Sequence, residues 1–320
     1  MNTKVSICCL TYNQKQYIKQ TIDSFISQKT DFKYEIVIHD DCSTDGTIDI
    51  LNEYESKYPD LIKVIYEKEN LYSQGKKIEQ IAYKNCSGKY IALCEGDDYW
   101  CDNTKLQKQF EFMKLHPNCS LVTHGCYLLD SKTDKLKKKS QPFKGSRYYS
   151  IEEIISGDGG IFATNSMFFE KKSVMNMPDF YYNISIGDFP TMLHLALCGD
   201  IYYIDEFMSV YRVGAAGSWS IAQTTGNKEQ IINKQTKFYT ELENMLAEIN
   251  KITEGKYNKA ISELLLKKKY MLLLLIEDYE QIKKEEFKQL YKIYSLKEFK
   301  QKIKLFLVRN MPNLYRKMKG

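Results

Sequence analysis

The stretch "YIALCEGDDYW", Tyr90 to Trp100, begins as an apolar, strand-like run and then brings three carboxylates within four positions. These acidic residues are Glu95, Asp97 and Asp98. Like charges this close repel, and the repulsion is most readily tolerated where a cation lies among the carboxylates or where they share a proton. The alternative is a solvated turn whose Asp residues cap the next helix. The rest of the chain decides between these interpretations.

The strand-like run is one of four in the first hundred residues, each short and rich in Val, Ile, Tyr and Cys. Such runs are typical of buried parallel strands. Segments with apolar residues at helical spacing separate them. This alternation predicts an α/β fold with a doubly wound, mostly parallel sheet and right-handed connections. The expected strands are 5–10, 35–39, 62–66 and 90–94, and the expected helices are 16–27, 47–58 and 76–85.

Polar residues follow each of the four expected strands. In an open parallel sheet the carboxyl ends of the strands lie at one edge, and ligands bind in the crevice there. We therefore expect side chains far apart in the sequence to meet at a single site. They are Thr11, Tyr12 and Asn13 after the first strand, Asp40 and Asp41 after the second, Glu67 and Asn70 after the third, and the acidic cluster after the fourth.

The stretch "HDDCSTDGT" has a turn after its second Asp. Gly46 permits a left-handed backbone there, and Asp45 or Thr47 can cap the following helix. A turn explains these residues but not Asp40 and Asp41, whose carboxylates are suited to hold a ribose hydroxyl or a base N–H.

No glycine-rich phosphate loop follows the first strand, and "SQGKK" lacks the spacing of a Walker loop. A bound phosphate would therefore need another source of positive charge. A divalent cation held by Glu95, Asp97 and Asp98 would supply it, because hard oxygen ligands favour Mg²⁺ or Mn²⁺.

Three ordered motifs, "CCLTYNQKQYIKQTIDSFISQ", "DDCSTDGT" and "EGDDYW", together resemble the nucleotide-sugar-binding half of family 2 glycosyltransferases, which have the GT-A fold and include bacterial polysaccharide enzymes. The resemblance is close over roughly the first 130 residues and looser to about Ser220. It implies that a sugar moves, with inversion, from a nucleotide diphosphate sugar, expected to be a UDP-sugar, to a hydroxyl of a glycan or lipid-linked acceptor.

The resemblance also implies roles for individual residues. The nucleotide pocket is lined by Thr11, Tyr12 and Asn13, and Asp40 and Asp41 belong to it, with Asp41 contacting the base or ribose. Asp97 meets the metal and the diphosphate together with Glu95, which stands where the family more often has Asp, or with Asp98.

On the acceptor side, the motif "IGDFP" places Asp188 where the family has its general base, and Gly187 where Glu is commoner. Inverting transfer needs one base to take the proton of the acceptor hydroxyl, while the metal stabilises the departing diphosphate. The alternative role for Asp188 is a helix cap. In "YRVGAAGSWS", Gly214 replaces a His of the family, and Arg212 is a candidate diphosphate contact or a strand-end Arg paired with a carboxylate.

Beyond the acidic cluster the patterns are weaker. A strand is expected at 120–129, a solvated Lys-rich loop at 130–147, a helix ending near Cys198, and two short strands in "IYYIDEFMSVYRV". Lys/Glu/Leu-rich helical patterns dominate from about Asn227. We therefore expect a glycosyltransferase domain at 1–225, with its nucleotide-sugar half at 1–130 and its acceptor half at 131–225, and a C-terminal helical region at 226–320.

The composition, 43% hydrophobic and 27% charged with a net charge of +5, is that of a globular protein. No basic stripe interleaved with aromatics occurs in the first half, so nucleic acid is not an expected partner. The apolar run at the N-terminus is too short for a signal peptide, which predicts a cytoplasmic protein. The basic tail "FKQKIKLFLVRNMPNLYRKMKG" predicts a solvated amphipathic helix, with peripheral contact to the inner face of the membrane as the alternative.

Two other functions compete with this interpretation. A sugar-phosphate nucleotidyltransferase also combines an α/β nucleotide domain with a metal, but it usually opens with a Gly-rich loop that this chain lacks. A non-catalytic nucleotide-sugar or glycan binder would keep the fold without turnover, and the departures at Glu95, Gly187 and Gly214 favour it.

Overall fold

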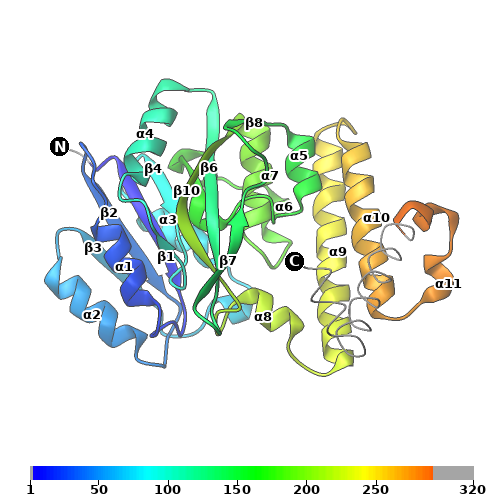
Figure 1. Ribbon diagram of the computed structural model, residues 1–320, viewed down its shortest axis with the longest axis horizontal. Helices are drawn as coiled ribbons and strands as arrows, with labels where there is room; N and C mark the ends of the chain where they lie inside the picture. The colour runs from blue at the N-terminus through cyan, green and yellow to red at the C-terminus, as the bar shows by residue number, and fades with distance from the viewer. Residues whose placement is uncertain (1–2, 291–320) are drawn as a thin grey trace, which may run out of the picture.

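The computed structural model describes residues 3–290 (Figure 1). Its centre is a ten-stranded mixed sheet with the order β3-β2-β1-β4-β9-β6-β10-β5, to which β7 adds beside β6 and β8 beside β10. The strands are β1 (Val5–Thr11), β2 (Tyr34–Asp40), β3 (Ile62–Tyr66), β4 (Tyr90–Leu93), β5 (Tyr99–Trp100), β6 (Cys119–Asp130), β7 (Lys135–Ser140), β8 (Arg147–Tyr149), β9 (Phe168–Glu170) and β10 (Asp200–Val213).

Helices cover both faces of the sheet (Figure 1). The α-helices are α1 (Ile18–Ile26), α2 (Thr47–Lys57), α3 (Ile78–Asn85), α4 (Lys105–Leu115), α5 (Ile151–Gly157), α6 (Asp179–Tyr182), α7 (Asp188–Cys198), α8 (Trp219–Thr224), α9 (Lys228–Ile252), α10 (Asn258–Leu275) and α11 (Tyr279–Ile282). Short 3₁₀ turns are η1 (Tyr72–Gln74), η2 (Thr164–Ser166), η3 (Lys171–Val174) and η4 (Glu285–Phe287).

The N-terminal half confirms the predicted βαβ order. Strand β1 pairs in parallel with β2 and β4, and β2 pairs in parallel with β3. Strand β1 lies between β2 and β4 and is buried on both faces of the sheet, which explains its largely apolar sequence. Val5, Ile7 and Cys9 join the hydrophobic cluster under α1, α2 and α4, whereas Cys8 joins the cluster on the opposite face.

The second half of the sheet is mixed, and two local predictions for it are wrong. The segment expected to form two short strands is the single strand β10, which pairs in parallel with β6. Its register shifts between Ile204 and Phe207, so the charged Asp205 and Glu206 lie in a bulge. The Lys-rich segment expected to be a loop contains β7, which pairs antiparallel with β6. A strand with a single neighbour in the sheet needs no apolar pattern, and Lys is common on such strands.

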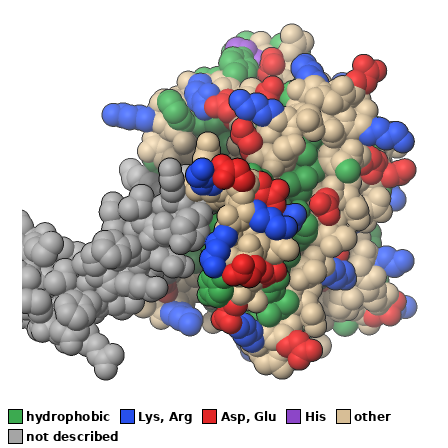
Figure 2. Space-filling model, turned by 90° about the vertical axis from the view of Figure 1, so that its right-hand side faces the viewer, with side chains coloured by type: hydrophobic (Ala, Val, Ile, Leu, Met, Phe, Trp, Pro, Cys, Tyr) green, Lys and Arg blue, Asp and Glu red, His purple; other side chains and the backbone are tan. Residues whose placement is uncertain are grey.

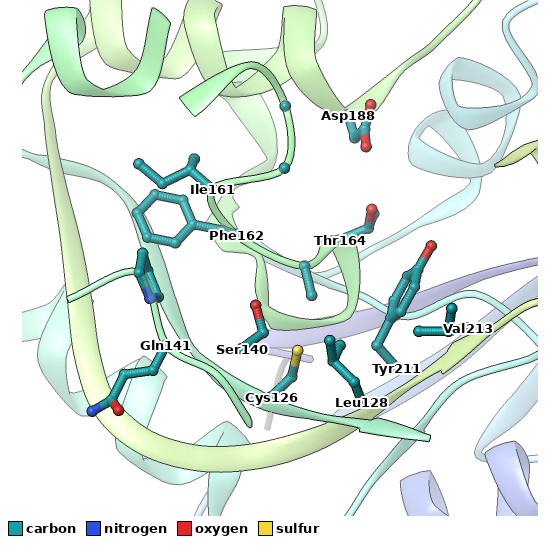
Figure 3. Close-up of a pocket in the computed structure, with 14 residues that line it drawn as sticks. Cys126, Leu128, Ser140, Gln141, Ile161, Phe162, Thr164, Asp188, Tyr211 and Val213 are labelled. Atoms are coloured by element: carbon teal, nitrogen blue, oxygen red, sulfur yellow. The ribbon is translucent and has the colours of Figure 1, made fainter. Parts of the chain in front are cut away.

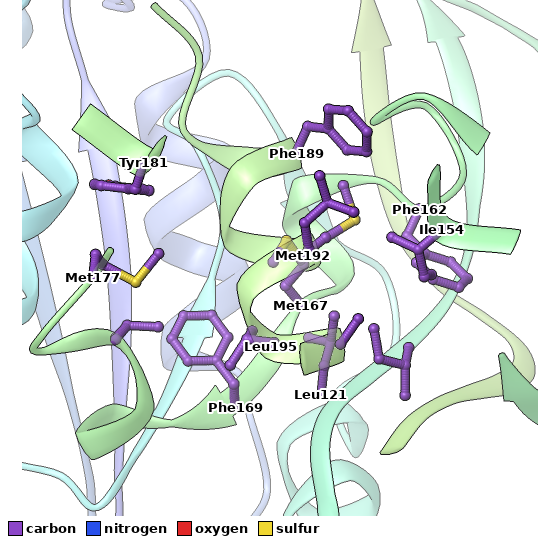
Figure 4. Close-up of a cluster of buried hydrophobic side chains, with 14 of the residues drawn as sticks. Leu121, Ile154, Phe162, Met167, Phe169, Met177, Tyr181, Phe189, Met192 and Leu195 are labelled. Carbon is purple, nitrogen blue, oxygen red and sulfur yellow. The ribbon is translucent and has the colours of Figure 1, made fainter. Parts of the chain in front are cut away.

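The larger hydrophobic cluster lies on the α3, α5 and α7 face of the sheet (Figure 4). Figure 4 shows Phe169 and Leu121 from neighbouring strands packed beneath Met192 and Leu195 of α7. Helices α9 and α10 close the same cluster. They contribute the buried residues Leu242, Met245, Leu246, Ile249, Ala260, Ile261 and Leu264.

The C-terminal helices thus share a core with residues of the 131–225 segment. The predicted acceptor role of that segment and the boundary at 225/226 stay predictions. Figure 2 shows the α10 and α11 side, where acidic and basic side chains are interspersed. The basic tail from Phe299 onward, with its predicted membrane contact, lies outside the described residues. Within residues 3–290, no helix combines the length and the apolarity needed to span a bilayer.

Leucine substitutions test this core assignment. Leu121 is fully buried on β6, whereas Leu115 at the end of α4 is 74% exposed. Leu121→Ala should lower the free energy of unfolding by about 2–5 kcal/mol, because it removes buried methyl groups and leaves a cavity. Leu115→Ala is the matched control and should change it by less than about 0.5 kcal/mol. Urea unfolding measures both, and equal losses would contradict the assignment.

Candidate active site

The acidic loop that follows β4 packs directly on the end of β1. The N–H of Gly96 donates to the carbonyl of Leu10 at 2.9 Å. A Cβ atom at position 96 would lie 2.3 Å from Gln14 Oε1 and 2.7 Å from Thr11 Oγ1, so only glycine fits this approach. Thr11 itself is buried and donates to Gln14 Oε1 at 2.8 Å. The predicted convergence of strands one and four is therefore observed, with Thr11 beneath the loop.

The other two residues after β1 differ in exposure. Tyr12 is 40% exposed and is available to a ligand. Asn13 has a left-handed backbone, with φ of 52°. Its Oδ1 accepts from the N–H of Thr44 at 2.7 Å, and its N–H donates to Ser43 Oγ at 2.8 Å. Asn13 therefore joins the turn after β1 to the turn after β2.

The two Asp residues at the end of β2 have different tasks. Asp41 accepts from the N–H groups of Leu71 and Tyr72 at 2.8 and 3.0 Å, one on each carboxylate oxygen. Its carboxylate thus fixes the loop after β3. Asp40 accepts from the N–H of Ser43 through Oδ1, while its buried Oδ2 has no hydrogen-bond partner in the part of the chain that the structure describes. Burial raises the pKa of Asp40.

The residues after β3 support this arrangement. Asn70 donates to the carbonyl of Asp41 at 3.3 Å. Glu67 lies 3.1 Å from Nε2 of the buried His39. Both residues therefore contact the end of β2, as the shared sheet edge predicts.

The third acidic residue of the cluster, Asp98, is held on both carboxylate oxygens. Asp98 Oδ1 accepts from the main-chain N–H of Arg212 at 2.7 Å, and Oδ2 accepts from Asn165 Nδ2 at 2.8 Å. Asp98 is 1% exposed, and burial raises its pKa well above the ordinary value. Its contacts tie the acidic loop to β10 and to η2.

Arg212 lies under the loop. Its guanidinium donates to the carbonyl of Asp97 and to Gln20 Oε1, and it stacks 4.8 Å from the ring of Tyr17 and 4.9 Å from that of Tyr99. Only 6% of the residue is exposed. Its positive charge lowers the pKa of Asp97 and so offsets part of the burial effect. Arg212 therefore acts on the acidic loop from below.

The two other carboxylates of the acidic loop are those of Glu95 and Asp97. Burial and then repulsion from Asp97 raise the pKa of Glu95 to about 8, and burial raises that of Asp97 to about 6. Glu95 Oε2 is buried and has no hydrogen-bond partner among the described residues. Within the described residues no three His, Cys, Asp or Glu side chains are arranged to hold a metal ion. A cation at Glu95 and Asp97 would thus need further ligands from water or substrate, as Mg²⁺ commonly does.

Asp188 begins α7 on the other side of the acidic loop. Its Oδ1 accepts from the N–H of Phe189 at 2.7 Å. The cap position is Gly187 and α7 has no side-chain cap hydrogen bond, so the alternative prediction of Asp188 as the helix cap is wrong. Burial raises its pKa, and its charge in turn raises that of Glu95. Figure 3 shows Asp188, Thr164 and Tyr211 at one end of a pocket of about 580 Å³. The pocket's remaining lining includes Cys126, Leu128, Ser140, Gln141, Ile161, Phe162 and Val213.

The segment that precedes Asp188 is fixed by residues that the motifs did not indicate. Lys77 Nζ donates to the carbonyls of Ile184 and Ile186, each at 2.6 Å. Glu241 of α9 accepts from the N–H of Ser185 at 2.9 Å. Lys77 occurs in the "SQGKK" stretch, whose only sequence signal is that it lacks the spacing of a Walker loop. Glu241 and Asn165 have no sequence signal at all, because their roles depend on contacts with distant segments.

Asp98 is bound on both carboxylate oxygens by other parts of the protein, whereas Asp97 is a candidate metal ligand. Substitutions of the two residues should therefore affect stability differently. Asp98→Ala would leave the Asn165 amide and the Arg212 N–H without their acceptor, and should lower the free energy of unfolding by about 2–4 kcal/mol. Asp97→Ala keeps the main-chain carbonyl that Arg212 binds, and should change the free energy of unfolding by less than about 1 kcal/mol. Denaturant unfolding measures both. If Asp97→Ala lowers the free energy of unfolding more than Asp98→Ala does, Asp97 and not Asp98 is the structural carboxylate.

The raised pKa of Glu95 predicts a dependence of stability on pH. Without divalent cations, the folded chain holds this proton to about pH 8, whereas the unfolded chain releases it near its ordinary pKa of 4.5. The unfolded state thus binds fewer protons across this window, so stability should fall as pH rises. Glu95→Gln should remove part of the fall. This effect is measured as the Tm of the wild type and of Glu95→Gln in EDTA from pH 5 to pH 8. Parallel curves of Tm against pH would contradict the raised pKa of Glu95.

Comparison with known proteins places the whole arrangement in a family. The family model described as Glycosyl transferase family 2 matches residues 6–176, more than half of the chain. An uncharacterised protein of Mycobacterium tuberculosis is 32% identical over 226 residues, which are 70% of this chain and 63% of that protein. The Escherichia coli UDP-Glc:alpha-D-GlcNAc-diphosphoundecaprenol beta-1,3-glucosyltransferase WfaP is 38% identical over 34% of this chain and 41% of its own length. The chain thus matches less than two thirds of either relative.

A solved structure shows the same fold at low identity. The mannosyltransferase PcManGT from Pyrobaculum calidifontis, in complex with GDP-Man and Mn²⁺, superposes with a TM-score of 0.58 at 14% identity. The superposition covers 99% of this chain and 84% of that one. At this identity the likeness concerns the fold alone, and it confirms the predicted GT-A architecture. With the family match over the motif-bearing half, the chain belongs to glycosyl transferase family 2.

Proposed function

We propose that this protein is an inverting, divalent-metal-dependent glycosyltransferase that moves a sugar from a UDP-sugar to a hydroxyl of a glycan or lipid-linked acceptor. The observation that carries the proposal is the placement of Asp188. This carboxylate lines a pocket of about 580 Å³ and interacts electrostatically with Glu95 of the acidic loop. An acid-rich loop for the donor diphosphate and a separate carboxylate for the acceptor are the two parts that such a reaction needs.

The nucleotide would lie over the ends of β1 and β2. Tyr12 offers an exposed ring for stacking on a base. Asp40 is the better candidate for the base or ribose contact, because its Oδ2 is unpartnered whereas both oxygens of Asp41 are used by backbone N–H groups. Asp40 is fully buried, so this contact requires the turn above it to open. Asp41 and Asn13 then support the site by fixing its loops.

The metal would be held by Asp97 with Glu95. The unpartnered Glu95 Oε2 and the raised pKa values of both groups fit a site that gains from a cation. A bound Mn²⁺ or Mg²⁺ would neutralise the charge that develops on the leaving diphosphate. Asp98 and Arg212 contribute by fixing the loop from behind, since their polar atoms are used in contacts with each other, Asn165 and Gln20.

On the acceptor side, Asp188 would take the proton of the attacking hydroxyl. Its raised pKa, caused by burial, brings its basicity closer to neutral pH than that of an ordinary Asp. The hydrogen bond from the Phe189 N–H fixes one carboxylate oxygen and leaves the other for the acceptor. Apolar Ile161, Phe162 and Leu128 beside Thr164 and Tyr211 give the pocket the mixed lining that suits a sugar ring.

The donor and acceptor classes have support from relatives. The full name of WfaP gives UDP-Glc as donor and a diphosphoundecaprenol-linked sugar as acceptor, and PcManGT was solved with GDP-Man and Mn²⁺. These facts belong to those proteins and support a nucleotide-sugar donor and a divalent cation here. The cytoplasmic location and the contact with the inner face of the membrane stay predictions.

Transfer assays with two variants test the proposal. With UDP-sugars and Mn²⁺ present, the wild type should release UDP, and a chelator or Asp97→Ala should abolish release. Asp188→Asn should bind donor normally but lose about 10²-fold or more in transfer, because the base is gone. Donor binding is measured as the rise in Tm with UDP-sugar and Mn²⁺. Donor binding without turnover in the wild type would favour the non-catalytic binder, and unchanged transfer by Asp188→Asn would place the base elsewhere.

A further inference from the structure

The entrance to α7 is occupied by a side chain from another part of the chain. Gly187 precedes Asp188 with φ of −110°, a conformation that any residue can adopt. A Cβ atom at Gly187 would nevertheless lie 1.7 Å from Glu79 Oε1 and 2.8 Å from Glu79 Cδ. The lack of a side chain at position 187 therefore makes room for the Glu79 carboxylate, which comes from the first turn of α3.

Glu79 belongs to a set of contacts between the segment after β3 and the segment before Asp188. Lys77 donates to the carbonyls of Ile184 and Ile186. Tyr72 Oη donates to the carbonyl of Ser185 at 3.5 Å. Tyr72, Lys77 and Glu79, which follow β3, thus lie along the backbone of residues 184–187. Glu79 is the one beside Gly187, directly before Asp188.

The charges around Glu79 decide what it can do. Burial raises the pKa of Glu79, the nearby Lys77 lowers it, and the charge of Asp188 raises it. The same Lys77 ammonium also attracts Asp188. An Asp188 drawn onto Lys77 would be lost as a base. A carboxylate at Glu79 opposes this, because it balances Lys77 and repels Asp188.

We infer that Glu79 is a positioning residue for Asp188: its carboxylate fills the space beside Gly187 and keeps Asp188 turned away from Lys77 and toward the pocket. This inference rests on the proposed function, in which Asp188 is the base. Glu79 of α3 would thus supply the carboxylate that is missing at position 187, where this chain has Gly. The position of Glu79 behind the α7 entrance, outside the pocket lining, fits an action through Asp188 and not on the acceptor.

A carboxylate exchange tests the inference. Glu79→Gln keeps the shape of the side chain and removes its charge, and should lower kcat about 10-fold with little change in the KM for donor. Glu79→Ala should lower kcat at least as much. Adding Gly187→Glu to Glu79→Ala should restore kcat to within about threefold of the wild type, because its Cβ fits in the space that the Glu79 carboxylate vacates and its own carboxylate returns a negative charge to the α7 entrance. Gly187→Glu alone should be poorly active or unstable, because the two side chains overlap.

Controls separate charge from folding and this inference from the proposed function. Glu263→Gln, on the exposed face of α10, should leave kcat unchanged, and the rise in Tm with UDP-sugar and Mn²⁺ should be the same in every folded variant. If Glu79→Gln keeps the wild-type kcat, or if the double variant is as slow as Glu79→Ala, the inference is wrong while the proposed function stands, provided that Asp188→Asn is inactive. If Asp188→Asn transfers normally, both are wrong.

Discussion

The whole site depends on keeping three carboxylates buried together at the end of β4. Burial raises the pKa values of Glu95, Asp97 and Asp98, and repulsion by neighbouring carboxylates adds to this effect at Glu95 and Asp98. The fold compensates from one side only. Asn165 and the main chain of Arg212 satisfy Asp98, and the Arg212 guanidinium lies beneath Asp97. Glu95 Oε2 keeps no hydrogen-bond partner within residues 3–290, and in the proposed reaction a cation would offset the remaining negative charge.

This one-sided compensation explains why β10 has to reach the end of β4. Strand β10 pairs with β6 along one side from Asp200 to Val213, and on its other side it pairs with β5, which directly follows the acidic loop. The pairing of Ser209 with Trp100 and of Val210 with Tyr99 sets the register that brings Arg212 under the loop. The acceptor half therefore completes the acidic loop structurally and also supplies Asp188. The C-terminal helices continue this support, since Glu241 of α9 holds the segment before Asp188.

The N-terminal half could be predicted from the sequence because each signal there is local. Strands buried on both faces read as apolar runs, and the polar residues that follow them converge because parallel strands end at one edge. The division of tasks within those polar pairs could not be predicted. Asp40 and Asp41 are adjacent and identical, and only the N–H groups of Leu71 and Tyr72 distinguish them. Asp98 differs from Asp97 only through contacts made by Asn165 and Arg212, which are distant in sequence.

The second half was less predictable for related reasons. The Asp205 and Glu206 pair interrupts the apolar pattern of β10 at a bulge, so one strand looks like two. Glu79 carries no motif, and its contact with the α7 entrance follows from the packing of α3 against the acceptor half.

The central claim is that the acidic loop and Asp188 serve one reaction centre at the carboxyl edge of the sheet. The most direct measurement is a crystal structure with UDP and Mn²⁺, in which anomalous scattering locates the metal. We expect Mn²⁺ about 2.1 Å from an Asp97 carboxylate oxygen and beside the diphosphate of UDP, with Asp188 facing the same crevice across the pocket. Mn²⁺ away from Asp97, or UDP bound away from the ends of β1 and β2, would contradict it.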